Sequence, residues 1–356
     1  MFEKISVNSL KYKTSELPNI PTNECVLPAL TAGIQNQGLN NYVPRDNATI
    51  LKNVISISAN GANTGATFYQ SKEFTVLQDA YAIKWIYTDE KLSDNSYIFL
   101  TSSIHKTIYG NYEWTNKAGW ERIKNDKIKL PTKNGKIDFD FMESFIAELE
   151  AERVAELSAY LKVSGYDNYE LSADEVDALR KFETLEWNSF NLKDLFGQST
   201  RGKRLKSADR ISGDLPFVTA GEADEGISAY ISNDVEVFEK NTTTIDMFGS
   251  AKYRNYKYGA DDHIAVVHTE KLPKYASIFV TTAIHKSSHN GQFNYGKNFY
   301  AKDADELFIQ LLVKNGTPDF ETMELLISSV HKLVIKDVVL YSDKKIAATK
   351  KIVSDN

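Results

Sequence analysis

Pro28-Ala29-Leu30-Thr31-Ala32-Gly33 returns 188 residues later as Pro216-Phe217-Val218-Thr219-Ala220-Gly221. A second stretch, from Ile98 to Lys106, returns as Ile278 to Lys286. Two such repeats in the same order indicate that the chain contains two copies of one domain. A chain of this kind can present two similar surfaces to a partner that is itself two-fold, and duplex DNA is the commonest such partner.

Each copy has the pattern of short strands joined by turns. In the first copy, Val54–Ser58 alternates and is followed by the turn-rich segment Asn60–Gly65; in the second, Thr242–Phe248 and Ile264–Val267 have strand character. The repeated stretch that begins at Ile98 contains no Gly or Pro, which favours a helix packed on a sheet. We therefore predict an α+β protein whose two copies are mixed α/β domains dominated by a twisted sheet.

An amphipathic helix follows each copy. Apolar residues recur at helical spacing from Asp138 to about Lys162, and again from Asp319 onward. The predicted order is a first domain over residues 1–137, a central helical spacer over 138–187, a second domain over 188–317 and a C-terminal spacer helix over 318–356.

The two helices are candidates for coiled-coil pairing. If a pseudo-two-fold axis relates the two copies, the helices run antiparallel and form a rod that holds the domains apart. A helix of about 25 residues is about 37 Å long, and one turn of B-DNA is about 34–36 Å. The predicted rod therefore has the length needed to place two domains on successive major grooves.

The net charge of −6 is unevenly distributed. Residues 138–186 hold 14 Asp and Glu and 4 Lys and Arg, so the rest of the chain carries a net charge of +4. Basic residues gather before the second Pro-x-x-Thr-Ala-Gly segment, at Arg201, Lys203 and Arg204. Such a cluster is typical of a phosphate-binding surface, although a single cluster also suits a solvated loop.

No catalytic set stands out in the sequence. Gly-x-Gly, Walker and Glu-x-Lys patterns are absent, and the six histidines lack metal-ligand companions at useful spacing. Asp261-Asp262-His263 can be interpreted as a metal or acid-base site, but its counterpart, Gln78-Asp79-Ala80, has no histidine, which favours a structural role. We therefore expect no catalytic residue, no metal and no cofactor in this chain.

Composition also restricts the compartment. The single cysteine, Cys25, excludes an internal disulfide and fits a reducing environment. No apolar run approaches the roughly 20 residues that cross a bilayer, and the first residues lack the pattern of a signal peptide. We expect a cytoplasmic protein that does not bind membranes.

Polar, basic and aromatic loops occupy matching places in the two copies, while their sequences differ. Arg, Asn, Gln and Lys can discriminate base edges in the major groove, and Lys, Ser and Thr can bind phosphates. Different loops on one framework are typical of two domains with two targets, although surface loops also diverge without a function. The candidate DNA-binding residues are Asn60, Asn63, Thr64, Lys106, Tyr109, Asn111, Tyr112, Trp114, Arg201, Lys203, Arg204, Lys252, Tyr253, Arg254, Lys257, Lys286, His289, Asn290 and Gln292.

This ordered set of motifs resembles the DNA specificity (S) subunit of type I restriction-modification systems. The resemblance rests on the Pro-x-x-Thr-Ala-Gly segments, the run Ile55–Gly65, and Asn188–Phe196 at the start of the second domain. It implies two target-recognition domains, each reading one half of a bipartite DNA sequence, and paired helices that fix the spacer. One departure is that the first copy lacks a clear counterpart of Asn188–Phe196, so its N-terminal edge packs differently or depends on a partner.

The resemblance also implies partners. Two methylation (M) subunits would dock on the helices, bind S-adenosylmethionine and methylate a flipped adenine. Restriction (R) subunits that use ATP and magnesium join such complexes when DNA is also cleaved. The S-type subunit of type IIB systems looks the same at this level and stays an alternative. From other functional classes, a β-rich adhesive or glycan-binding module and a nuclease with an unfamiliar site are further alternatives.

Overall fold

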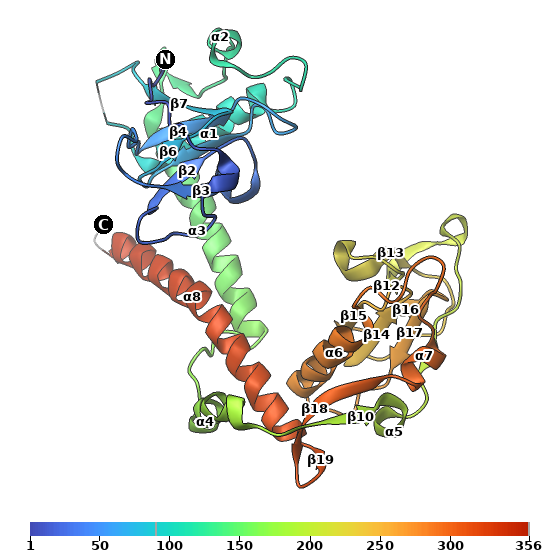
Figure 1. Ribbon diagram of the computed structural model, residues 1–356. Helices are drawn as coiled ribbons and strands as arrows, with labels where there is room; N and C mark the ends of the chain where they lie inside the picture. The colour runs from blue at the N-terminus through green and yellow to red at the C-terminus, as the bar shows by residue number, and fades with distance from the viewer. Residues whose placement is uncertain (90, 355–356) are drawn as a thin grey trace. The chain divides into compact units, whose positions relative to one another are not determined.

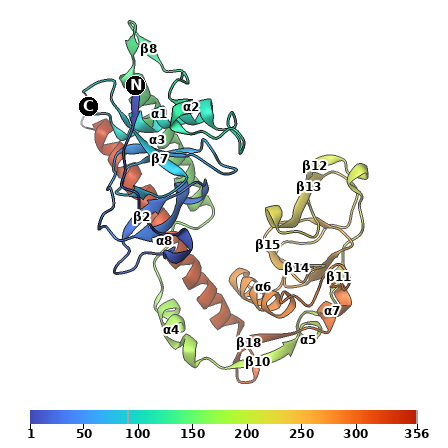
Figure 2. The ribbon, with the colours of Figure 1, turned by 45° about the horizontal axis from the view of Figure 1, so that its top comes forward.

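The computed structural model describes residues 1–89 and 91–354 (Figures 1 and 2). The chain forms two compact units. The first comprises Met1–Leu157 together with the chain from Lys345 onward, and the second comprises Ser158–Lys344. Among the described residues, no helix is both long and apolar enough to span a membrane.

The first unit is built on a sheet of order β1-β7-β4-β5, covered by helix α1 (Asp94–Ile108). All five residues of β4 are buried, because β7 and β5 pair with its two edges and α1 packs on one face. A smaller sheet of order β3-β2-β6 packs on this sheet through an apolar cluster that contains Leu30, Val54 and Ala82. The strands are β1 (Phe2–Lys4), β2 (Leu27–Leu30), β3 (Leu39–Val43), β4 (Val54–Ser58), β5 (Thr67–Gln70), β6 (Thr75–Val76) and β7 (Ala80–Trp85).

The second unit has the same order of elements. Its main sheet runs β11-β17-β14-β15, its smaller sheet runs β13-β12-β16, and helix α6 (Lys274–Ser288) covers the main sheet. The strands are β11 (Thr200–Arg201), β12 (Ser212–Val218), β13 (Ile227–Ile231), β14 (Thr242–Asp246), β15 (Ala251–Arg254), β16 (Gly259–Ala260) and β17 (Ile264–Val267). The mixed α/β character predicted from the sequence is confirmed.

The repeated Pro-x-x-Thr-Ala-Gly segment builds the same turn in both units. The backbone N–H of Thr31 donates to the carbonyl of Gly38, and that of Thr219 donates to the carbonyl of Gly226. The glycines have φ values of +86° and +82°, and a Cβ at either would lie 2.8 or 2.6 Å from the carbonyl oxygen of the threonine. Only glycine fits such a position, which explains why it recurs.

Each unit continues beyond its helix with a short helix and a hairpin. In the first unit these are α2 (Trp120–Ile123) and the strands β8 (Thr132–Lys133) and β9 (Lys136–Ile137). In the second they are α7 (Ala301–Asp305), β18 (Phe308–Lys314) and β19 (Thr317–Pro318). Among the residues that the structure describes, only the second unit also has β10 (Trp187–Asn191), which pairs with β18, and the short helix α5 (Leu192–Phe196).

Two long helices and a short one complete the chain. Helix α3 spans Phe139–Val163 and helix α8 spans Phe320–Ser354, in agreement with the helices predicted from apolar spacing. Helix α4 (Ala173–Lys181) begins with a capping box, in which Ser172 and Glu175 exchange side-chain-to-backbone hydrogen bonds. Glu175 also forms a largely buried ion pair with Lys332 over 2.9 Å, which fixes α4 to α8.

Candidate nucleic-acid interface

In the first unit, the turn that follows β4 lies against the C-terminal end of α1. The hydroxyl of Tyr109 donates to Asn63 over 3.5 Å, and the backbone N–H of Ala118 donates to the hydroxyl of Thr64 over 2.9 Å. Gly65 permits the close approach, since a Cβ there would lie 3.1 Å from the carbonyl oxygen of Ile108. The structure therefore brings the turn-rich segment Asn60–Gly65 and the segment that follows α1 together into one surface.

The second unit brings the corresponding segments together. The Ser288 hydroxyl at the end of α6 donates to the Gly249 carbonyl over 2.6 Å, and His289 Nδ1 lies 3.2 Å from the carbonyl oxygen of Phe248. Phe248 also packs edge-on against Tyr295, with ring centroids 5.1 Å apart. The contacts differ from those of the first unit in residue type, while the meeting of turn and helix end is the same.

A histidine supports each of these surfaces from beneath. His105 Nδ1 accepts the backbone N–H of Thr67 over 3.2 Å, and His285 Nδ1 accepts that of Ala251 over 3.1 Å. Burial lowers the pKa of both histidines, and at His285 the nearby His289 and Lys252 lower the pKa further. Because Nδ1 must be unprotonated to accept a hydrogen bond, the lowered pKa maintains the contact between helix and strand.

Predicted residues that project from these surfaces have the chemistry of nucleic-acid contacts. They offer cations, amides and aromatic rings, which suit phosphates, base edges and base faces. In the first unit the exposed ones are Lys106, Tyr109, Asn111 and Trp114, and in the second they are Lys286, His289 and Asn290. Asn63 is partly exposed beside Tyr109. Where each of these contacts DNA stays a prediction.

Tyr295 is not among the DNA-binding residues predicted from the sequence, although the structure places it on this surface. Its side chain is 85% exposed, which is unusual for an aromatic residue, and Phe248 holds its ring in place. The sequence carried a signal, because Asn294-Tyr295-Gly296 places an aromatic ring between two turn residues. In the first unit the large exposed ring is Trp114, at 65% exposure, with the ammonium of Lys117 5.4 Å from its centre.

The predicted loop through Lys252, Tyr253, Arg254 and Lys257 is a strand over much of its length, because β15 spans Ala251–Arg254. Successive side chains of a strand point to opposite faces. The Lys252 ammonium accordingly turns toward Ser250 and Glu222, while the Tyr253 hydroxyl donates to Asn241 over 2.9 Å. Lys257 lies beyond the strand and pairs with Glu239 over 2.7 Å.

Arg254 and Thr64 were wrong candidates for direct contact with DNA, since they are only 1% and 2% exposed. The Arg254 guanidinium donates to the Thr244 hydroxyl, the Tyr256 hydroxyl and the Glu225 carbonyl, each over 2.9 Å. The Thr64 hydroxyl accepts the backbone N–H of Ala118 inside the fold. Both side chains stabilise the framework on which the surface loops rest.

Several other candidates are held by neighbours. Asn60 donates to Asp79 over 2.7 Å and Tyr112 donates to Asp126 over 2.8 Å. The Gln292 amide donates to the carbonyl of Ser287 over 3.1 Å. These contacts position the loops, and they leave fewer groups free for a ligand.

The basic cluster Arg201–Arg204, at strand β11 of the second unit, also contains both paired and exposed side chains. Arg201 forms an ion pair with Asp262 over 3.4 Å and lies 5.4 Å from the centre of the Tyr300 ring. Lys203 and Arg204 are exposed. They are the members of the cluster that are best placed for phosphates.

Asp261, Asp262 and His263 do come together, with one ligand atom of each within 4.8 Å of the others. However, Asp261 Oδ1 accepts the backbone N–H of Leu205 over 3.1 Å, and the Arg201 guanidinium lies beside Asp262. A neighbouring cation opposes metal binding, and the contacts to Leu205 and Arg201 connect the basic segment to the sheet. The arrangement favours the structural role that the sequence suggested.

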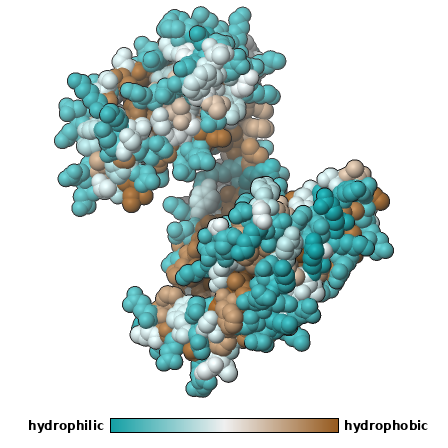
Figure 3. Space-filling view, turned by 45° about the vertical axis from the view of Figure 1, so that its right-hand side comes forward, coloured by the Kyte–Doolittle hydropathy of each residue, from teal (hydrophilic) through white to brown (hydrophobic). Residues whose placement is uncertain are grey.

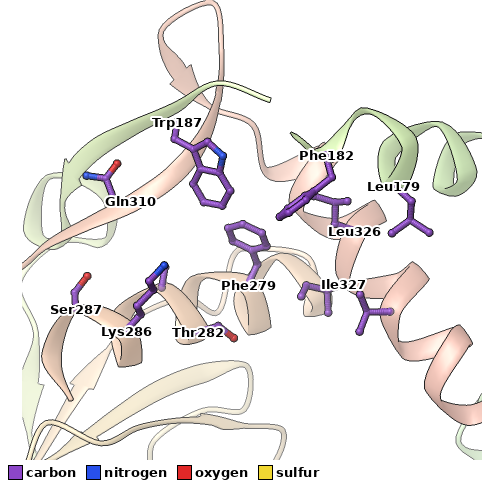
Figure 4. A pocket seen from close by; sticks show the side chains of 12 residues that line it. Leu179, Phe182, Trp187, Phe279, Thr282, Lys286, Ser287, Gln310, Leu326 and Ile327 are labelled. Carbon is purple, nitrogen blue, oxygen red and sulfur yellow. The ribbon is translucent and has the colours of Figure 1, made fainter. Parts of the chain in front are cut away.

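Apolar side chains also reach the surface of both units (Figure 3). In the second unit they line a groove of about 820 Å³ between α4, β10, α6 and the start of α8. Figure 4 shows Phe182, Trp187 and Phe279 gathered there, with the rings of Trp187 and Phe279 stacked 5.9 Å apart. Lys286 and Gln310 also line the groove.

Comparison with known proteins gives a family match along most of the chain. The model of a family described as the type I restriction modification DNA specificity domain matches residues 4–159 and 184–307. The specificity subunit S.BcgI of a type II restriction enzyme, from Heyndrickxia coagulans, is 28% identical over 239 residues, which are 65% of this chain and 66% of that protein. The alignment thus spans just under two thirds of that relative.

A solved structure has a similar fold. The crystal structure of the S subunit of a type I restriction-modification system from M. genitalium aligns with a TM-score of 0.59. The alignment covers 99% of this chain and 91% of that chain, at 16% sequence identity. At this identity the likeness concerns the fold alone.

Proposed function

The chain belongs to the type I restriction-modification DNA specificity family, and from this premise we propose that each of its two units reads one half of a bipartite DNA sequence. It is a specificity subunit of a restriction-modification system. The role of this family is DNA recognition, and we propose that the chain itself performs no catalysis. Recognition would take place in the cytoplasm, where the chain meets duplex DNA.

The observation that carries the proposal is the pair of equivalent surfaces described above. In both units a turn after the central strand meets the end of the covering helix, and a histidine supports the contact. The exposed groups differ, with Tyr109 and Trp114 on one surface and His289 and Tyr295 on the other. A common framework with different exposed groups is what two readers of different half-sites require.

We further propose that α3 and α8 pair as an antiparallel coiled coil, so that residues 138–187 and 318–356 act as spacers between recognition domains 1–137 and 188–317. Two contacts support the antiparallel direction. Glu150 of α3 pairs with Lys345 of α8 over 2.6 Å, and Tyr166, just after α3, contacts the ring of His331. A pseudo-two-fold relation of the two domains would suit a bipartite site on duplex DNA.

The partners would supply the chemistry. We propose that two methylation subunits dock on the helices, where Phe141, Phe145 and Leu149 of α3 are each at least 40% exposed. These partners would bind S-adenosylmethionine and methylate the recognised sequence, and restriction subunits using ATP and magnesium would add cleavage. A type IIB enzyme, in which one partner both methylates and cleaves, is the alternative within the family. The similarity to S.BcgI, the specificity subunit of a type II restriction enzyme, supports this alternative.

Selection from a pool of randomised duplexes tests the proposal. The chain assembled with its methylation subunit should enrich two short conserved blocks separated by a spacer of fixed length. Binding should fall steeply as salt rises, since phosphate contacts release counterions. Enrichment of a single continuous block, or no enrichment at all by an assembled complex, would contradict it. Binding to glycans instead of DNA would support the adhesive alternative.

A further inference from the structure

Residues 127–133 of the first unit correspond to strand β18 of the second. Both segments lead into a hairpin with the same turn sequence, Lys133-Asn134-Gly135 in one and Lys314-Asn315-Gly316 in the other. The hairpin pairing also corresponds, since Lys133 faces Lys136 and Lys314 faces Thr317. Ile128 and Leu130 are therefore the counterparts of Ile309 and Leu311.

In the second unit this strand is covered by the segment Trp187–Phe196. Strand β10 pairs with β18 over five residues, from Trp187 opposite Leu312 to Asn191 opposite Phe308. Helix α5 then brings Leu192 into the core, where it is fully buried in the same apolar cluster as Ile284, Ala304 and Ile309. As a result, Ile309 and Leu311 are inaccessible to solvent.

In the first unit, no described segment covers the equivalent edge. Residues 127–131 have no strand partner among the described residues, and Ile128 and Leu130 are partly exposed. Against this edge the first unit has a cavity of about 350 Å³, which Met1 and Phe2 also line. Its lining includes Ile104, Ile123 and Ile128, the counterparts of residues that share an apolar cluster with Leu192 in the second unit.

The backbone of this edge is oriented to accept a strand. In the second unit the N–H of Val313 donates to Glu186, so Leu311 and Ile309, which lie two and four residues away, also face β10. Their counterparts are Leu130 and Ile128, whose N–H groups have no backbone partner within residues 1–89 and 91–354. Pro131 does not interfere, because its carbonyl accepts the N–H of Asp138 on the other side, as the carbonyl of Leu312 accepts that of Asp319.

The charges of the edge indicate the chemistry of the missing strand. Lys127 and Lys129 replace Phe308 and Gln310 of the second unit, and both are exposed. Neither forms an ion pair with another residue in the described part of the chain. Opposite charges on directly facing residues of two strands stabilise their pairing.

We propose that this edge binds an extended segment of the methylation subunit, which pairs antiparallel to residues 127–131, places acidic side chains opposite Lys127 and Lys129, and inserts an apolar side chain into the cavity beside Ile128. The segment would thus complete the first unit as Trp187–Phe196 completes the second. The identity of the partner rests on the proposed function.

A peptide tests the edge directly. The probe has the sequence of residues 187–196 with Ser189→Glu and Asn191→Glu, and it is titrated into the full chain. Binding should slow amide exchange at Ile128 and Leu130. The K127E/K129E variant should bind this peptide about tenfold more weakly. A second peptide, with Lys at the two Glu positions, should restore binding to that variant. A K52E/K72E control, at exposed lysines elsewhere in this unit, should behave as wild type. Equal binding by all variants, or no protection at millimolar peptide, would overturn the proposal.

The assembled complex tests the partner. Amide exchange at residues 127–131 should slow when the methylation subunit binds, before DNA is added. Protection that appears only with DNA would mean that the lysines contact phosphates, and protection of the chain alone that grows with its concentration would mean that a second copy binds; either result overturns the proposal. A complex that selects a bipartite sequence without protecting these residues overturns this inference and leaves the proposed function intact. Failure to select any sequence overturns the proposed function instead.

Discussion

His285 Nδ1 accepts the backbone N–H of Ala251 over 3.1 Å, and this hydrogen bond joins the covering helix of the second unit to strand β15 beneath its exposed loop. The first unit makes the same contact between His105 and Thr67 over 3.2 Å. The repeated Ile-His-Lys in the sequence is therefore a structural feature: the histidine faces the sheet while the lysine that follows it is exposed. The pattern connects the framework to residues that we propose contact DNA.

Replacement of His285 by Ala should destabilise the second unit by about 1–3 kcal/mol, because the buried N–H of Ala251 loses its acceptor. Chemical denaturation at neutral pH measures the effect. Lys286→Ala, at the next position of the same helix, should change stability by less than about 0.5 kcal/mol. Similar values for the two variants would show that the contact contributes little.

The same contact predicts a pH dependence. The pKa of His285 in the folded chain lies below the ordinary value of 6.5, first because of burial and then because of His289 and Lys252. As the pH falls through about 6.5, the unfolded chain therefore takes up a proton before the folded chain does, and stability decreases. The contribution of this contact to the free energy of unfolding should be fully present above that pH and should decline below it. In His285→Ala this part of the decline should disappear.

Arg254 should act on stability and not on half-site reading. Arg254→Ala leaves three acceptors without their donor and should cost about 3 kcal/mol. Arg254→Gln should cost less, because the counterpart in the first unit is Gln70, which donates to Ser56 and Gln37 as Arg254 donates to Thr244 and Glu225. Well below the melting temperature, both variants should select the wild-type DNA sequence. A stable variant with relaxed selection at one half-site would restore Arg254 as a reader.

Exposed residues of the two surfaces should affect different half-sites. Lys286→Ala with Asn290→Ala should weaken or relax selection at one block of the target, and Lys106→Ala with Asn111→Ala should act on the other. A residue that contacts a base is expected to contribute about 1–3 kcal/mol, whereas loss of a phosphate contact weakens binding to all sequences. Sequencing of the selected duplexes separates these outcomes. If either pair of changes altered both blocks equally, the assignment of one block to each unit would fail.

Local patterns allowed much of the fold to be predicted, and contacts between distant residues explain the misses. The alternation in Val54–Ser58 and the helical spacing after Asp138 depend on neighbouring residues, so the sequence predicted β4 and α3. The segment around Lys252–Arg254 reads as a polar loop, yet it is a strand because Thr242–Ile245 pair with it. Burial of Arg254 depends on Glu225, 29 residues away, and no local pattern indicates such a contact.

The same reasoning applies to the candidate site, where local sequence indicates exposure but not contacts between distant residues. Residues at the helix ends, such as Lys106 and Asn290, are exposed, as a residue that contacts DNA must be, and their contact with DNA stays a prediction. Asn60 and Gln292 have the same residue types but hold the loops through Asp79 and Ser287. Residue type alone cannot separate a side chain that contacts a ligand from one that positions a loop.

The proposed spacer makes a quantitative prediction. Insertion of four residues in the middle of α3, with four more at the facing position of α8, should lengthen the paired helices by about 6 Å. Because duplex DNA rises about 3.4 Å per base pair along one strand, the selected spacer should grow by about two base pairs. Four Gly and Ser residues added instead between Gly165 and Leu171, a segment outside the helices, should leave the spacer unchanged. Methylation mapping of both variants reports the spacer length directly, and an unchanged spacer after the helical insertion would mean that α3 and α8 do not set the distance between half-sites.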